Sequence, residues 1–152
     1  MFFIFILPFF TFYLFTLHPT VSVGDSGELI TAAYTLGIAH PPGYPLWTIL
    51  GKIFTVIIPF GNIAYRVNLM SAFFGACTCA IFYFIIKKIV IVEENNEKKL
   101  SEARALSTII LCLSSTLWSQ SIISEVYTLN AFFVVLIIYL LLTTSDLRLV
   151  VF

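Results

Sequence analysis

Four side chains capable of acid–base chemistry stand out in an otherwise apolar sequence. Asp25 and Glu28 lie three residues apart, and His40 follows in a stretch rich in proline and glycine. Glu125 comes much later in the chain. Two carboxylates at positions i and i+3 around a helix start can share a metal ion or the work of a general base. The plainer interpretation is that Asp25 and Glu28 only cap a helix. His40 can likewise be an ordinary loop residue, and Glu125 an ordinary surface acid.

Other residues near these acids allow two interpretations each. Arg66 can pair with a phosphate or a lipid headgroup, or its side chain can simply extend toward water. Tyr44 belongs to a group of aromatic residues that are typical of the membrane interface and, secondarily, of sugar stacking. The other members of that group are Trp47, Trp118 and Tyr127.

The composition indicates that lipid surrounds most of the chain. Of 152 residues, 60% are hydrophobic and 11% are charged, and the mean hydropathy is +1.03. Soluble domains average about 45–50% apolar and about 25% charged residues. The apolar runs are long and continuous, so we predict an all-α polytopic membrane protein rather than a barrel. The net charge is zero, so the sequence lacks the excess of positive charge that is typical of nucleic-acid-binding domains.

The cysteines give no sign of a metal centre. All three lie inside apolar runs, and Cys77 and Cys79 have neither zinc-site spacing nor the redox spacing of two intervening residues. We therefore predict that the cysteines are small buried residues within helices and that they form no metal site.

We predict four membrane spans and two short juxtamembrane helices. The spans cover about residues 1–17, 63–88, 105–118 and 128–144. The short helices, 26–36 and 46–58, lie in a loop over 18–62, and Ser26 is the predicted N-cap of the first. The second is too short to span comfortably. A solvated loop is predicted at 89–104. A signal peptide is the alternative for the first span, but the sequence lacks a basic start and a small-residue cleavage site.

The distribution of basic residues orients the predicted helices. With a cytoplasmic amino terminus and a helix 46–58 that does not cross, most basic residues fall on the cytoplasmic side. These are Lys87, Lys88, Lys98, Lys99, Arg104 and Arg148. If 46–58 crossed, the cluster from Lys87 to Arg104 would lie outside. The favoured arrangement places the loop 18–62 and Glu125 together on the outer or luminal side.

Three stretches of the chain resemble a known protein family. Residues 24–46 read GDSGELITAAYTLGIAHPPGYPL, and the similarity continues through RVNLMSA at 66–72 and SEVYTLN at 124–130. The first string resembles the amino-terminal signature of a multi-spanning family, once described as a domain of unknown function, that occurs in bacteria and animals. Its animal branch resembles protein O-mannosyltransferases of the endoplasmic reticulum that act on immunoglobulin-like folds of plexin-type receptors.

The resemblance implies a GT-C-like architecture, which is that of lipid-phosphosugar-dependent glycosyltransferases. By position, Asp25 matches the loop acid usually assigned as the catalytic base, and Glu28 is its near neighbour. Glu125 lies where related enzymes often place a second luminal acid. His40, Tyr44 and Arg66, which lie within the matching strings, are expected to bind substrate.

The implied reaction moves mannose from dolichyl-phosphate mannose to a Ser or Thr hydroxyl of a luminal acceptor protein, with inversion at the sugar. No cofactor is implied beyond this lipid-linked donor, and the need for a divalent metal stays open. The expected location is the endoplasmic reticulum membrane, or the inner membrane if the chain is bacterial. Family members have many more spans, so we expect this chain to be the front part of the enzyme.

Two other functional classes compete with this interpretation. A transporter or channel subunit would place charged or polar residues in mid-span, where few are found. A non-catalytic membrane scaffold is the other alternative. Neither explains why acids, a histidine and Pro41-Pro42 gather at one membrane boundary.

Overall fold

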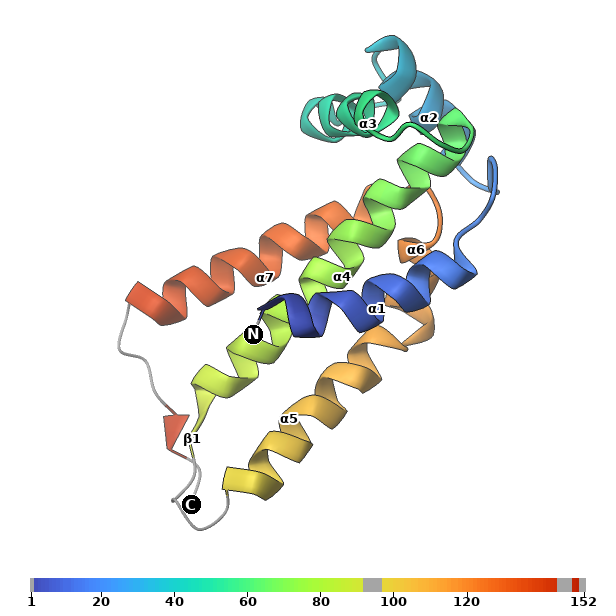
Figure 1. The fold of residues 1–152 in the computed structure, drawn as a ribbon. Coiled ribbons are helices and arrows are strands. Elements are labelled where there is room, and N and C mark those ends of the chain that lie inside the picture. The colour runs from blue at the N-terminus through green and yellow to red at the C-terminus, as the bar shows by residue number, and fades with distance from the viewer. Residues whose placement is uncertain (1, 92–96, 145–148, 151–152) are drawn as a thin grey trace.

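A computed structural model gives the fold and describes residues 2–91, 97–144 and 149–150 (Figure 1). Its elements are α1 (Phe2–Thr16), α2 (Ser26–Thr35), α3 (Pro45–Ile57), α4 (Ile63–Ile89), β1 (Val90–Ile91), α5 (Glu97–Cys112), α6 (Ser115–Ser121), α7 (Tyr127–Thr144) and β2 (Leu149–Val150). The two short strands pair in parallel. Apart from this pair, the described chain is helical, as predicted.

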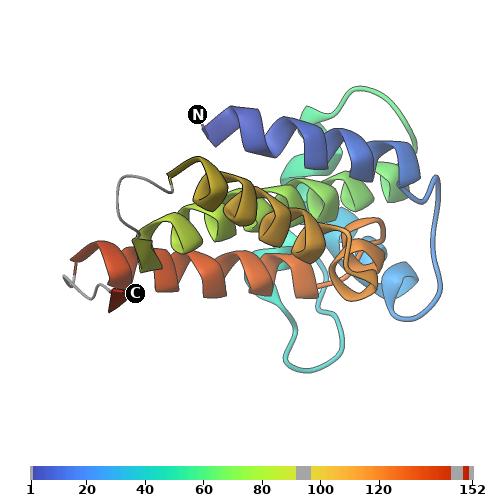
Figure 2. The same cartoon turned by 90° about the horizontal axis from the view of Figure 1, so that it is seen from below.

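The helix α4 is the element around which the others are arranged. It contacts α1, α2, α3, α5, α6 and α7, and Figure 2 shows α1 and α7 on opposite sides of α4 and α5. Asn62 caps its start by accepting a hydrogen bond from the Tyr65 backbone N–H at 2.8 Å. Lys87 and Lys88 lie in its last turn, where positive charge complements the helix dipole.

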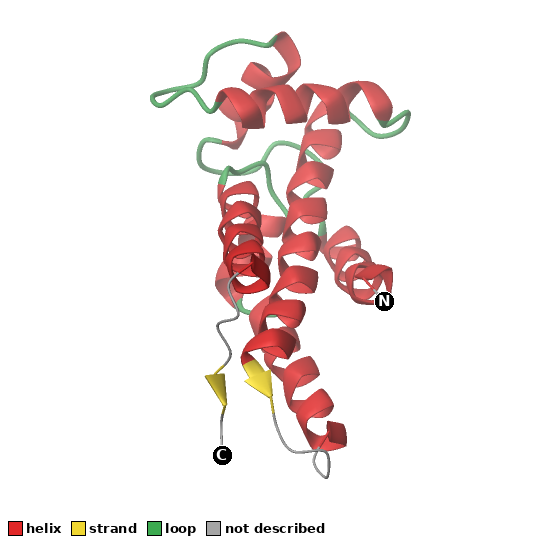
Figure 3. Cartoon of the chain, turned by 90° about the vertical axis from the view of Figure 1, so that its left-hand side faces the viewer, coloured by secondary structure: helices red, strands yellow, loops and turns green. Residues whose placement is uncertain are grey.

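Two short helices pack together at the amino-terminal end of α4. Figures 1 and 3 show α3 lying across this end of the bundle, beside α2. Gly51 permits their close approach, because a Cβ there would lie 2.7 Å from the Ala33 Cβ. Pro45 occupies the first turn of α3, where its missing N–H costs nothing. With 13 residues, or about 20 Å, α3 is too short to cross the hydrocarbon core.

Within the described ranges, α4 and α7 are the helices long and apolar enough to cross a membrane. The side chains of α4 are mostly buried, whereas those of α7 are mostly exposed. Ile137 and Leu140 on α7, for example, leave 56% and 51% of their surface uncovered. Such a face needs apolar surroundings. The structure thus supports two of the four predicted spans by length and composition, since α1 has 15 residues and α5 is followed by a break.

The region predicted as a solvated loop (89–104) and a span (105–118) is organised differently. A single helix, α5, covers parts of both segments and ends at Cys112. Its first half is rich in Glu, Lys, Ala and Arg, which are good helix formers even where they are solvated. The chain leaves the helix after Cys112, and the Ser114 hydroxyl caps α6 by accepting from the Leu117 N–H at 3.4 Å. Residues 92–96 of the predicted loop lie outside the described ranges.

Two other details correct the sequence-based expectations. Asp25, not Ser26, occupies the N-cap position of α2, and its side chain makes no capping hydrogen bond. Arg104, expected in solvated loop, is 6% exposed and donates a hydrogen bond to the Val90 carbonyl at 2.7 Å. The long Arg side chain reaches the carboxyl end of α4, where the last carbonyls lack helical partners.

A disulfide between α4 and α5 joins Cys79 to Cys112, with Cα atoms 5.9 Å apart. The buried Tyr13 of α1 donates a hydrogen bond to the Cys112 carbonyl at 2.9 Å, so three helices meet here. Cys77 is a free buried thiol, as predicted. No local pattern predicts this disulfide, because the two partners are 33 residues apart on different helices.

The contact at Gly51 generates a prediction about stability. Replacing Gly51 with Val should push α3 away from Ala33 of α2, and overpacking of this kind costs about 1–3 kcal/mol. The measurement is thermal unfolding in detergent. Gly27→Ala is the matched control, because a Cβ there meets only the Val21 side chain at 3.4 Å. Equal unfolding midpoints for Gly51→Val and the wild type would contradict the close approach.

Candidate active site

Asp25, Glu28 and His40 form one cluster at the α2–α3 end of the bundle. The Glu28 carboxylate accepts a hydrogen bond from the His40 backbone N–H at 2.5 Å and lies 3.2 Å from the ring Nδ1. The opposite ring nitrogen, Nε2, lies 3.9 Å from Asp25 Oδ2. Glu28 therefore fixes the imidazole so that its far nitrogen faces Asp25. These bonds to His40, first to its backbone and then to its ring, lower the pKa of Glu28.

Glu125 joins this cluster from the other half of the chain. Its carboxylate accepts hydrogen bonds from the backbone N–H groups of Asp25 and Val126. Only 9% of Glu125 is exposed, whereas the Asp25 side chain is 63% exposed. Burial, followed by repulsion from Asp25, raises the pKa of Glu125 despite those hydrogen bonds. The site thus consists of an accessible carboxylate with a buried one behind it.

Two buried side chains hold the loop that carries Glu125. Trp47 of α3 donates its indole N–H to the Glu125 carbonyl at 3.1 Å. Asn68 of α4 accepts a hydrogen bond from Ser124, the residue just before Glu125. Neither Asn68 nor Ser124 was predicted to have a role in the site. A signal was present, since a fully buried asparagine within an apolar helix is expensive and calls for a specific partner.

Tyr44 connects the acidic cluster to an apolar groove. Its ring lies edge-on to the His40 ring, with centroids 5.5 Å apart. Tyr44 also lines a groove of about 350 Å³ between the start of α3 and the start of α7. The remaining lining residues are Pro45, Leu46, Trp47, Val126, Tyr127, Leu129, Asn130 and Phe133. The groove therefore begins beside Glu125 and follows α7 away from the acids.

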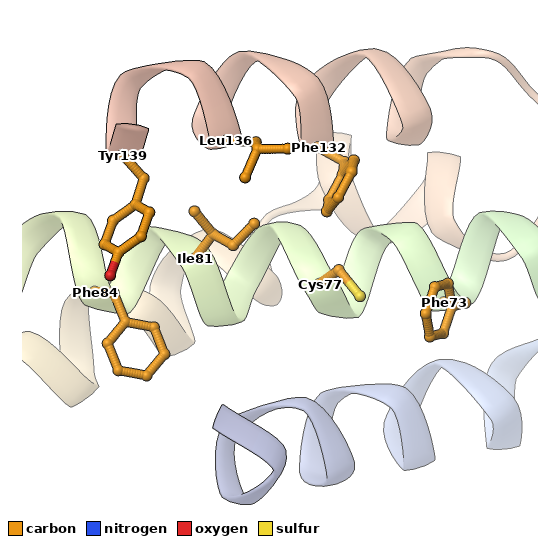
Figure 4. Close-up of a pocket in the computed structure, with 7 residues that line it drawn as sticks. All are labelled: Phe73, Cys77, Ile81, Phe84, Phe132, Leu136 and Tyr139. Atoms are coloured by element: carbon orange, nitrogen blue, oxygen red, sulfur yellow. The ribbon is translucent and has the colours of Figure 1, made fainter. Parts of the chain in front are cut away.

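A second apolar groove lies between α4 and α7. Its volume is about 480 Å³, and it is lined by Phe73, Cys77, Ile81, Phe84, Phe132, Leu136 and Tyr139 (Figure 4). Figure 4 shows Phe132, Leu136 and Ile81 in the space between the two helices, and the Tyr139 hydroxyl directed toward Phe84. Phe132 and Phe133, adjacent on α7, line the second and the first groove respectively. Both grooves thus lie along the same membrane-length helix.

Arg66 is not brought to the acidic cluster. Its Nε lies 3.1 Å from the carbonyl oxygens of Phe60 and Gly61, and Nη1 donates to the Thr55 carbonyl at 2.9 Å. These carbonyls belong to the last turn of α3 and to the α3–α4 connection. The guanidinium therefore stabilises that turn, and within the described residues no contact joins it to Asp25, Glu28 or Glu125.

No three side chains of His, Cys, Asp or Glu among the described residues are arranged to hold a metal ion. What the cluster can do on its own is accept a proton. The Asp25 carboxylate is exposed and can be reached by an incoming hydroxyl group. Glu28 orients the His40 ring toward Asp25. A carboxylate within hydrogen-bond reach of a hydroxyl can act as a general base.

The site residues lie in the part of the chain that matches a known family. Residues 25–149 match the family described as "Protein O-mannosyl-transferase TMEM260 N-terminal domain". The chain belongs to this family. This confirms the resemblance drawn from the three strings.

Two relatives place the chain within longer proteins. "Protein O-mannosyl-transferase TMEM260" of Mus musculus is 41% identical over 128 residues, which are 82% of this chain and 17% of the mouse protein. "Protein O-mannosyl-transferase tmem260" of Dictyostelium discoideum is 37% identical over 130 residues, or 84% of this chain and 15% of that protein. The chain thus spans about a sixth of each relative. No solved structure matches it significantly.

The pKa of Glu28 is lowered and the pKa of Glu125 is raised. For this TMEM260-family domain, these opposite shifts predict opposite effects on stability when either glutamate is replaced by glutamine. The pKa of Glu125 is raised in the folded state, so its contribution to stability falls as pH rises from the ordinary glutamate pKa to the raised one. Glu125→Gln should therefore raise the unfolding midpoint at neutral pH. The pKa of Glu28 is lowered, so its contribution is present at neutral pH and is lost as pH falls through that lowered pKa. Glu28→Gln should lower the midpoint at neutral pH, by a small amount because the group is exposed.

Thermal unfolding in detergent between acidic and neutral pH measures both effects. Glu102→Gln, an exposed acid-to-amide change on α5, is the control. The same sign for Glu28→Gln and Glu125→Gln at neutral pH would contradict the proposed difference between the two carboxylates.

Proposed function

We propose that this domain forms the luminal acidic site of a GT-C-type protein O-mannosyltransferase. The observation that carries the proposal is the exposed Asp25 carboxylate, which lies between His40 and the buried Glu125. An apolar groove lined by Tyr44 and Val126, the neighbours of His40 and Glu125, lies close to this cluster. An accessible base beside a lipid-sized groove suits a reaction between a hydroxyl and a lipid-linked sugar. The names of the mouse and Dictyostelium relatives support the same reaction class.

Asp25 is the proposed general base. It takes the proton of a Ser or Thr hydroxyl while that oxygen bonds to C1 of mannose and the bond from C1 to the phosphate oxygen breaks. The products are the O-mannosylated protein and the lipid phosphate, with inverted configuration at C1. Glu28 acts through His40, whose Nε2 it directs toward Asp25. His40 and Tyr44, in edge-on contact, form the proposed wall against which the sugar binds.

The proposed donor is dolichyl-phosphate mannose, with its isoprenoid chain in the grooves along α7. The grooves are apolar, and the first begins at Tyr44 and Val126, next to the acids. A donor lying there would present its sugar to Asp25 while its chain stays in the apolar region. The departing phosphate needs compensating positive charge. Arg66 was the candidate for this role, but three backbone carbonyls compete for its guanidinium.

The proposed orientation places the acidic cluster in the lumen of the endoplasmic reticulum. The cluster lies at the end of α4 where α2 and α3 pack, and Lys87 and Lys88 lie at the opposite end. A cytoplasmic location for the lysine end agrees with the tendency of basic residues to stay inside. In this orientation the acceptor is a luminal protein domain.

The test is mannose transfer by the full-length protein in membranes, with labelled dolichyl-phosphate mannose and an immunoglobulin-like acceptor domain. Asp25→Asn should lower kcat by about 10²–10⁴-fold, the usual contribution of a general base. Glu102→Gln, an acid-to-amide change at the other end of the bundle, should leave transfer intact. Full activity of Asp25→Asn would remove the base assignment and move it to Glu125. An inactive wild type with every lipid-linked sugar would refute the enzyme itself.

A further inference from the structure

We propose that the Asn68–Ser124 hydrogen bond holds Glu125 against Asp25, which makes Asn68 and Ser124 positioning residues of the acidic site. Both side chains are fully buried. They therefore cannot touch a substrate and act only through the loops that they join. The catalytic consequence rests on the proposed function, whereas the positional tie does not.

The side-chain amide of Asn68 connects two loops that are far apart in the sequence. Its NH₂ group donates to the carbonyl oxygens of His18 at 2.8 Å and Thr20 at 3.1 Å. Its carbonyl oxygen accepts from the Ser124 hydroxyl. An asparagine side chain has two N–H donors and one carbonyl acceptor, so both donors and the acceptor are used. The first loop leads to Asp25, and the second carries Glu125.

The path from Asn68 to the two carboxylates is short. Ser124 directly precedes Glu125, and the Glu125 carboxylate accepts a hydrogen bond from the Asp25 N–H. The loops also touch directly, since the His18 N–H donates to the Ile122 carbonyl at 3.0 Å. These contacts form a closed ring that includes both acids and is anchored on α4 by Asn68. Loss of the Ser124 bond would free Glu125 on one side and leave the Asn68 oxygen buried without its partner.

Ser71 provides a matched control on the same helix. It is three residues from Asn68 and equally buried, but its hydroxyl has no hydrogen-bond partner in the part of the chain that the structure describes. Ser71→Ala and Ser124→Ala therefore each remove one buried hydroxyl group. Only Ser124→Ala also breaks a hydrogen bond that links the two loops.

The first measurement is amide hydrogen exchange in the full-length protein in lipid nanodiscs. Ser124→Ala should raise exchange about tenfold in 122–127, which loses its bond to Asn68, and also in 18–28, because a displaced Glu125 no longer holds the Asp25 backbone. Ser71→Ala should leave both segments at the wild-type rate. An unchanged rate in Ser124→Ala, or a rise in 122–127 alone, would overturn the tie.

The second measurement is mannose transfer by the same variants. Displacing a carboxylate without removing it should lower kcat about tenfold and leave KM for the acceptor unchanged. If Ser124 acts through Glu125, Ser124→Ala should have no further effect on kcat in a Glu125→Gln background. A merely structural serine would reduce kcat by the same factor in both backgrounds, and that result would overturn the proposal.

The two measurements separate this inference from the proposed function. An inactive wild type would refute the function, and exchange alone would then judge the tie between the loops. If Asp25→Asn abolishes transfer while Ser124→Ala keeps the wild-type kcat, the function stands and the positioning role falls.

Discussion

An asparagine amide buried in an apolar bundle must find partners for its donors and its acceptor, because water is absent there. Asn68 finds all of them in two loops at the amino-terminal end of α4. This requirement makes the irregular segments around residues 18–25 and 122–126 converge on one point. Trp47 adds a third element, α3, through its bond to the Glu125 carbonyl. The polar site is therefore anchored in the buried part of the bundle and does not depend on the loops to stay together by themselves.

The convergence has an electrostatic consequence. It brings Glu125 out of water and next to Asp25, and both effects favour the protonated form of Glu125, whose pKa is raised. Asp25 remains exposed, and Glu28 is engaged with His40 on the outer side. Three acids that look equivalent in the sequence thus have different environments. One is accessible, one is buried, and one orients a histidine. Such separation of environments is what allows carboxylates to take different roles in one site.

The parts of the structure that a sequence can predict are those with local causes. α3 begins at Pro45, α4 is a continuous apolar run closed by lysines, and the short helices cannot span because of their length. The grouping of Asp25, His40 and Glu125 was predicted only as a shared membrane face, from charge and family resemblance. The long-range contacts were not predictable in this way. Asn68 with Ser124 and Cys79 with Cys112 each join segments that no local pattern connects. The boundary predicted between the loop 89–104 and the span 105–118 does not coincide with a helix end, because helix propensity continues through charged residues and α5 ends before Ser114.

The position of the acids relative to α7 also bears on the competing functional classes. A transporter needs its polar groups in mid-membrane, where they can exchange a substrate between two faces. Here the cluster of acids lies at the end of the bundle, and the grooves along α7 are lined almost entirely by apolar side chains. Such grooves offer an ion or a sugar no polar path across. A molecule that is apolar along most of its length and polar at one end would satisfy both regions at once, because its chain would replace lipid on α7 while its head group reached Asp25.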